Sequence, residues 1–68
     1  MPKYEVAIFN QEVRDAIARK EQHDRYSDDW GTTQYIEIAA LNEEMARSKV
    51  SQQHPEHRGF VIEDISEV

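Results

Sequence analysis

The segment from residue 35 to residue 65 constrains the fold most, because it reads as a strand, a helix and a second strand in succession. Tyr35–Ala40 alternates in the manner of a half-buried strand, with the isoleucines on one face. Phe60–Ile65 is rich in β-branched residues and predicts another strand. Between them, Asn42 is a favourable helix N-cap, and the pair His54–Pro55 ends the helix. The chain therefore combines both kinds of secondary structure, and its predicted class is α+β.

The helix within this segment has consistent local signals. Asn42 can accept hydrogen bonds from the free amides of the first turn, where Glu43 and Glu44 also place negative charge that the helix dipole favours. Glu43 and Arg47 stand four residues apart in the favourable order, which predicts an ion pair that contributes about 0.2–0.5 kcal/mol. The predicted buried stripe consists of Met45, Ala46, Lys49 and Val50.

The N-terminal part of the chain supplies a further strand and a further helix. Tyr4–Phe9 also alternates, but apolar residues stand on both of its faces, which is typical of an inner strand. Asn10 is the expected N-cap of a helix over Gln11–His23. The short apolar stripe of this helix is formed by Val13, Ala16, Ile17 and Lys20.

The resulting order is β-α-β-α-β, and it predicts a single small α+β domain over residues 1–68. We expect a three-stranded sheet with two helices packed on one face, in a reduced ferredoxin-like arrangement. A strand-helix-strand crossover normally joins parallel strands, but the strand order does not follow from the sequence. The other face of the sheet is expected to turn residues such as Tyr4 or Tyr35 toward solvent or a partner.

Two short motifs carry a resemblance to a known family. Lys3-Tyr4-Glu5-Val6 opens the chain, and Asn42–Arg47 opens a helix that precedes the last strand. This arrangement resembles that of the small LX-type ribosomal proteins of archaea over part of the chain. The resemblance implies a similar architecture alone, because the acidic chain lacks the basic surface that RNA binding requires.

The apolar core of this domain is expected to be thin. Leu, Ile, Val and Phe account for 14 of the 68 residues, just above the level of about 20% below which charged chains tend to be disordered. Disulfides and thiolate metal sites are excluded, because the sequence has no cysteine. Association is the stabiliser that remains, so we expect either a protein partner or a homodimer.

The net charge of −6 narrows the choice of partner. It argues against nucleic acid, which normally requires a basic stripe, and equally against anionic membrane surfaces. No apolar segment reaches the length of a membrane span, and none near the N-terminus resembles a signal peptide. We therefore expect a cytoplasmic protein.

The residues His54 and His57 are the weak candidate for a metal site. Two imidazoles with a carboxylate between them are acceptable ligands for zinc. However, Pro55 prevents a helical presentation of the pair, and only His23 is left to complete the site. The alternative, which we favour, is a polar turn between the helix and the last strand.

The carboxylates Asp24, Asp28 and Asp29 form the densest acidic cluster, but the spacing of a calcium loop is missing. The interpretation that we favour is a solvated acidic loop in which Asp28 serves as an N-cap or turn residue. The alternative functional hypothesis is a module that binds a metal or a small ligand. It would use the His54/His57 turn and the Asp24–Asp29 loop.

The aromatic residues Tyr26, Trp30 and Tyr35 are the candidates for binding a partner, because large aromatic side chains recur as anchors of interfaces. The first two lie in the unpatterned loop from His23 to Gln34. A structural alternative is that Trp30 folds back and caps the thin core, as a lone tryptophan in a small domain usually does.

No pattern indicates catalysis or a cofactor. The serines lack a glycine-rich elbow, and the two glycines, Gly31 and Gly59, are too few for a nucleotide-binding loop. We therefore predict a small acidic interaction or regulatory domain with no catalytic activity of its own and no cofactor. It would bind its partner, or a second copy of itself, through an edge or a face of the sheet.

Overall fold

The computed structural model describes all 68 residues and contains three strands, two helices and two short 3-10 helices. The elements in chain order are β1 (Lys3–Asn10), α1 (Gln11–Ala18), η1 (Asp28–Gly31), β2 (Gln34–Ala39), α2 (Glu43–Gln53), η2 (Glu56–Arg58) and β3 (Phe60–Glu67). The predicted β-α-β-α-β order and the α+β class are confirmed.

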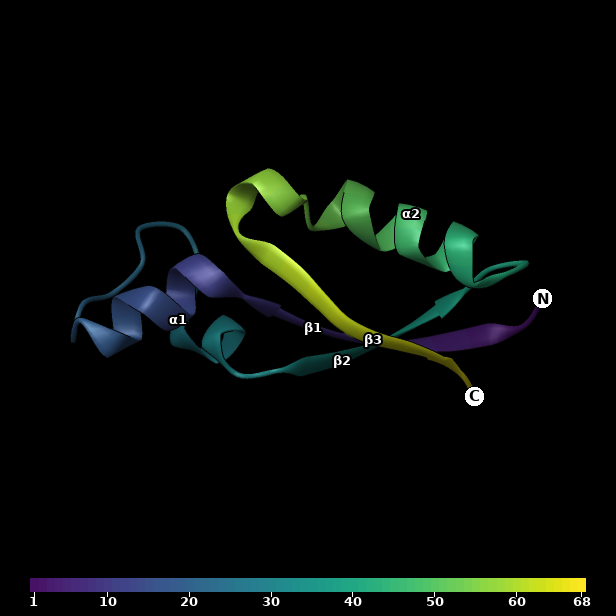
Figure 1. Cartoon of the computed structure of the whole chain (residues 1–68), viewed down its shortest axis with the longest axis horizontal. Helices are drawn as coiled ribbons and strands as arrows, with labels where there is room; N and C mark the ends of the chain where they lie inside the picture. The colour runs from purple at the N-terminus through teal and green to yellow at the C-terminus, as the bar shows by residue number, and fades with distance from the viewer.

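The three strands form one sheet in the order β2-β1-β3, and both outer strands are antiparallel to β1. β2 and β3 therefore run in the same direction with β1 between them. The connection through α2 passes over one face of the sheet, and α1 extends from the end of β1 (Figure 1). The central place of β1 agrees with its apolar residues on both faces, because an inner strand is covered on each side.

The core lies between α2 and the sheet. Tyr4, Val6 and Ile8 of β1 are buried there together with Ala46 and Val50 of α2. The prediction that Tyr4 faces solvent is wrong, because the alternation of β1 places Tyr4 on the same face as the two aliphatic residues. Tyr35 is opposite Ala7 and lies on the other face.

A β-bulge in β3 keeps the apolar residues of that strand on the core side. Ile8 pairs with Ile62, whereas Ala7 pairs with Asp64, so that Glu63 is the extra residue. In a regular strand, the three-residue spacing from Ile62 to Ile65 would place their side chains on opposite faces. The bulge returns Ile65 to the core, where it is buried.

The first helix is shorter than the sequence indicates. It ends at Ala18 rather than at His23, because Lys20 adopts a left-handed conformation with φ of 60°. The amide of Glu21 donates to the carbonyl of Ala16 at 2.8 Å, and the amide of Lys20 donates to that of Ile17 at 2.9 Å. These two bonds form a Schellman motif, a common helix end in which glycine usually takes the place of Lys20.

Asn10 joins the start of α1 to the turn before β3. This fully buried side chain accepts from the amide of Val13 at 3.1 Å, as a helix N-cap does, and donates to the carbonyl of Arg58 at 3.1 Å. Gly59 stands beside it with φ of 99°, and a Cβ atom there would come within 2.7 Å of the Asn10 Oδ1 atom. Only glycine therefore fits this turn without strain.

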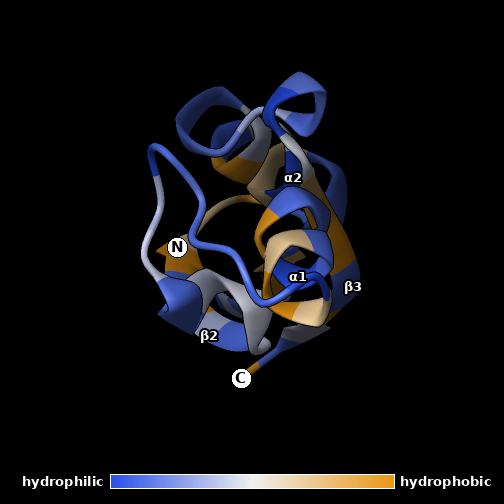
Figure 2. Cartoon of the chain, turned by 90° about the vertical axis from the view of Figure 1, so that its left-hand side faces the viewer, coloured by the Kyte–Doolittle hydropathy of each residue, from blue (hydrophilic) through white to orange (hydrophobic).

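The hydropathy of the ribbon follows this organisation. The loop that leaves α1 is hydrophilic along most of its length, whereas the hydrophobic segments lie within the strands and helices (Figure 2). α1 is covered mainly by η1, and Gly31 lies against Val13 and Ile17 of this helix. The packing of η1 on α1 therefore fixes the loop from His23 to Gln34 at that end of the molecule.

Candidate partner-binding site

Two of the three predicted binding aromatics belong to a cluster around Phe60. The rings of Tyr26 and Trp30 meet Phe60 edge-on, with centroids 5.1 and 5.2 Å from its own. The His54 ring lies 4.9 Å from Phe60 and 5.0 Å from Trp30, and His23 lies 5.4 Å from Tyr26. Edge-on contacts of this kind are favourable between aromatic rings.

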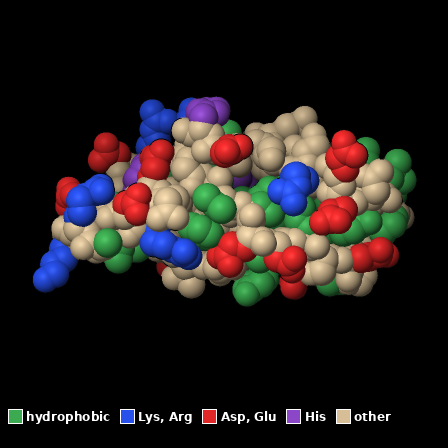
Figure 3. All heavy atoms as spheres, in the orientation of Figure 1, with side chains coloured by type: hydrophobic (Ala, Val, Ile, Leu, Met, Phe, Trp, Pro, Cys, Tyr) green, Lys and Arg blue, Asp and Glu red, His purple; other side chains and the backbone are tan.

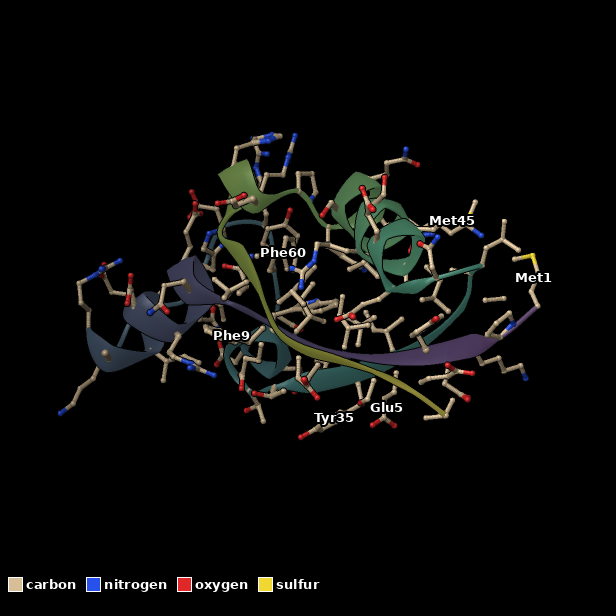
Figure 4. All side chains as sticks on the ribbon, turned by 45° about the vertical axis from the view of Figure 1, so that its right-hand side comes forward. Met1, Glu5, Phe9, Tyr35, Met45 and Phe60 are labelled. Carbon is tan, nitrogen blue, oxygen red and sulfur yellow. The ribbon has the colours of Figure 1, made fainter.

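This aromatic cluster closes one end of the core. Phe60 is buried and points between β3 and the end of α2 (Figure 4), while Tyr26 and Trp30 are half-buried and pack against the core residues. The structure therefore places Trp30 where the structural alternative expects it, as a cap on a thin core. Only partial surfaces of Tyr26 and Trp30 remain available to a partner.

Burial also changes the acid–base behaviour of one histidine in this cluster. Loss of solvent around His54 lowers its pKa below the ordinary value of 6.5, because burial disfavours the charged imidazolium. Between these two pKa values the unfolded chain binds a proton that the folded protein does not bind. The contribution of His54 to stability is therefore complete above about pH 6.5 and decreases as the pH falls below it.

We predict a matching difference in thermal unfolding. Between pH 7.5 and pH 5.5, the melting temperature of the wild-type protein should decrease more than that of His54→Phe. This variant keeps an aromatic ring but removes the group that binds the proton. The exposed His57 provides the control, since His57→Gln should follow the wild-type pH dependence. Calorimetry at matched ionic strength measures the effect. If His54→Phe and wild type lose the same amount, the burial of this imidazole does not affect stability.

The three histidines do not assemble into a metal site. The Nε2 atom of His23 is 3.0 Å from a carboxylate oxygen of Glu12, and His57 lines the same hollow of about 360 Å³. Arg25 and Arg58 line it as well, which is unfavourable for a cation. Nowhere in the chain do three His, Asp or Glu side chains gather closely enough to hold a metal ion, and His54 is occupied in the aromatic cluster.

Two of the three acidic loop residues, Asp28 and Asp29, do not line the hollow that contains His23 and His57. Asp28 and Asp29 occupy the first turn of η1, where the dipole of the turn favours negative charge, and both are exposed. The backbone carbonyl of Asp29 accepts hydrogen bonds from the amide of Thr32 at 3.1 Å and from the Gln34 side chain at 2.8 Å. The two aspartates thus shape the turn into β2, while Asp24 lies at the hollow of His23.

Tyr35 stands apart from the aromatic cluster, on the face of the sheet that α2 leaves uncovered. We call this face the open face and define it by Tyr35 with its neighbours Glu5, Ala7, Glu37 and Asp64. The register places Tyr35 opposite Ala7, and Ala7 opposite Asp64. The Tyr35 side chain is 68% exposed and, like that of Glu5, points away from α2 (Figure 4). It is the large aromatic residue that the fold leaves without cover.

Carboxylates are the nearest charged groups to this tyrosine on β1 and β2 of the open face. Glu5 and Glu37 are direct cross-strand partners, and like charges in such a position repel each other. Glu63 accepts a hydrogen bond of 2.5 Å from the hydroxyl of Thr33. Phe9, which also belongs to this side of β1, is covered by the Arg14 guanidinium, 3.6 Å from the centre of its ring. Tyr35 therefore combines an exposed ring with a negative surrounding.

The sequence predicts the wrong contact for Arg47. The predicted ion pair between Glu43 and Arg47 is absent, and the ion pairs present join Arg19 to Glu21 and His23 to Glu12. Arg47 instead lines a hollow of about 290 Å³ between α2 and β3. The sequence does contain one signal for this position: Arg47 is three residues before the apolar Val50, so both lie on the same side of α2.

These features define a small α+β domain with a three-stranded antiparallel sheet, an aromatic cluster and one uncovered sheet face. No family model, curated protein or solved structure matches the chain. The resemblance to the LX-type ribosomal proteins gains no support from these comparisons. No helix has both the length and the apolar composition that crossing a membrane requires.

Proposed function

We propose that this protein is a non-catalytic interaction domain that recognises a protein partner through the open face of its sheet. The observation that carries the proposal is the exposure of Tyr35 on the face of the sheet opposite α2 (Figure 4). An aromatic ring supplies a large contact area with few rotatable bonds, so that little conformational entropy is lost on binding. Tyr26 and Trp30 serve the core of the same domain and contribute less surface.

The charge of the open face specifies the chemistry of this partner. Glu5 and Glu37 repel each other in the free protein, and a lysine or arginine placed between them would relieve that repulsion. Two copies of the same face would instead bring additional carboxylates together. The proposed partner is therefore a protein with a basic surface rather than a second copy of this chain.

A substitution at Tyr35 tests the proposal. The partner is captured from native extract with the tagged full chain, identified by mass spectrometry and purified for titration calorimetry. Tyr35→Ser should weaken its binding by about thirtyfold, since a central aromatic anchor contributes about 2 kcal/mol or more. Tyr35→Ser and the wild-type protein should have the same stability, because an exposed substitution usually changes the free energy of unfolding by less than about 0.5 kcal/mol.

Leu41 provides the matched control. It is 63% exposed, close to the value for Tyr35, but it lies beside the start of α2 rather than on the open face. Leu41→Ser should leave the affinity unchanged. Equal losses in both variants, or none in Tyr35→Ser, would contradict the proposal. Light scattering could instead show a wild-type dimer that the Tyr35→Ser substitution dissociates. That result would identify a second copy of the chain as the occupant of the open face and contradict the proposal of a basic partner.

A further inference from the structure

The hollow between α2 and β3 is a second surface, independent of the open face. We call it the α2–β3 groove, and its lining residues are Arg47, Ser51, His54, Glu56, Phe60, Val61 and Ile62. Its volume of about 290 Å³ is just below the range of about 300–1,000 Å³ for ligand pockets. In Figure 3 a basic side chain lies beside hydrophobic atoms in the gap between α2 and β3. The groove thus pairs an apolar floor with a cation.

One wall of the groove is formed by a single stripe of α2. Arg47, Ser51 and His54 follow one another at intervals of four and three residues, which places their side chains on one side of the helix. Arg47 has neither an ion pair nor a hydrogen bond, although Glu56 lines the same hollow. A carboxylate that enters the groove would therefore meet a guanidinium that is not engaged elsewhere.

The other wall is an edge strand with free backbone groups. β3 pairs only with β1, so its other edge has no neighbouring strand. The amide of Gln11 donates to the carbonyl of Gly59, which shows that this carbonyl faces β1. Along an antiparallel strand, the backbone groups of successive residues point alternately toward the paired strand and away from it. The backbone N–H and C=O groups of Phe60 and Ile62 therefore point away from β1, toward an added strand.

The bulge limits how far an added strand can pair. It begins immediately after Ile62 and interrupts the regular ladder at Glu63 and Asp64. Pairing along the groove is therefore restricted to the backbone groups of Phe60 and Ile62. A short segment that ends in the groove fits this length better than a long strand that continues past it.

We propose that the α2–β3 groove binds the C-terminal tail of a partner protein, added as a short strand to β3, with its terminal carboxylate on Arg47. The last side chain of the tail would contact Phe60 and Ile62. Addition of a strand to a free sheet edge is a general mode of peptide recognition, in which the backbone gives affinity and pockets select side chains. A second copy of β3 is a poorer occupant, since Glu63 and Asp64 would face the same residues of the other chain.

Titration of the ¹⁵N-labelled full chain with model peptides tests this proposal. The probes are acetylated hexapeptides of alternating threonine and valine that end in valine, leucine or phenylalanine, each made with a free carboxylate and as the amide. We expect saturable shifts of the Phe60 and Ile62 amides with at least one free acid. Its amide should bind about tenfold more weakly, because a charge-assisted hydrogen bond is lost.

Two charge-matched variants complete the experiment. Arg47→Gln should abolish the difference between acid and amide, whereas Arg25→Gln, which removes the same charge outside the groove, should preserve it. Equal binding of acid and amide to wild type, shifts confined to other strands, or no saturable shift with any probe would each overturn the proposal. Because Tyr35 lies outside the groove, failure here is distinct from failure of the open face.

Discussion

Replacing Phe60 with alanine should remove most of the stability of this domain. Phe60 is 4% exposed and belongs to the core, and the rings of Tyr26, Trp30 and His54 all lie about it at 4.9–5.2 Å. Truncation of a buried phenylalanine costs about 3–5 kcal/mol. A chain of this length has a total stability of about 3–10 kcal/mol at ordinary values per residue. Phe60→Ala should therefore be marginally folded or unfolded at 25 °C.

Urea unfolding followed by the fluorescence of Trp30, which is the single tryptophan, measures this effect. Phe60→Leu is the control, because it retains an apolar side chain but loses the ring contacts, and it should cost about 1–2 kcal/mol. The variants thereby separate the packing of the core from the aromatic contacts. A loss below about 1 kcal/mol in Phe60→Ala would show that the aromatic cluster is not part of the cooperative core.

The elements of this fold follow from local sequence signals, but their assembly does not. The N-caps Asn10 and Asn42 each accept a bond from the amide three residues later, as their positions predict. The strand order depends instead on contacts between residues distant in the chain. β1 lies between β2 and β3, and its apolar residues on both faces were the one local indication of this position.

The errors have identifiable physical causes. The sequence predicts too late an end for α1, because Lys20 takes the left-handed position in which glycine is the usual signal. Glu43 and Arg47 have the spacing of an ion pair, but such exposed pairs contribute so little that other contacts decide the rotamer. Nothing in the unpatterned loop shows that Trp30 reaches Phe60, which is 30 residues further along the chain.

The same reasoning applies to the proposed sites. Tyr35 could be placed on one face of its strand from alternation alone, but whether a helix covers that face depends on the path of α2. The α2–β3 groove needs both the helix stripe with Arg47 and the edge position of β3, together with a bulge that has no clear sequence signature. Sites formed between distant elements therefore become visible only after the topology is known.

The second large effect is expected at Asn10, and Asn42 makes it possible to isolate its origin. Both asparagines are helix N-caps, with Oδ1 accepting at 3.1 Å from Val13 and at 2.8 Å from Met45. Asn42 is exposed and its side chain forms that one bond, so Asn42→Ala should cost about 1 kcal/mol. Asn10 is fully buried and also donates to the carbonyl of Arg58.

Asn10→Ala should therefore cost about 2–4 kcal/mol, the sum of a lost cap and a buried carbonyl left without its donor. Asn10→Asp retains the acceptor of the cap but removes the donor and introduces a buried charge, so its cost should exceed that of losing the bond to Arg58 alone. Both variants are compared with wild type and Asn42→Ala by urea unfolding at pH 7. The cap at Asn10 also fixes the turn at Gly59, so the amide signals of Arg58, Gly59 and Phe60 should shift in Asn10→Ala and remain in place in Asn42→Ala. Equal costs at the two caps would mean that the bond to Arg58 adds nothing, and that the turn before β3 is positioned by Gly59 alone.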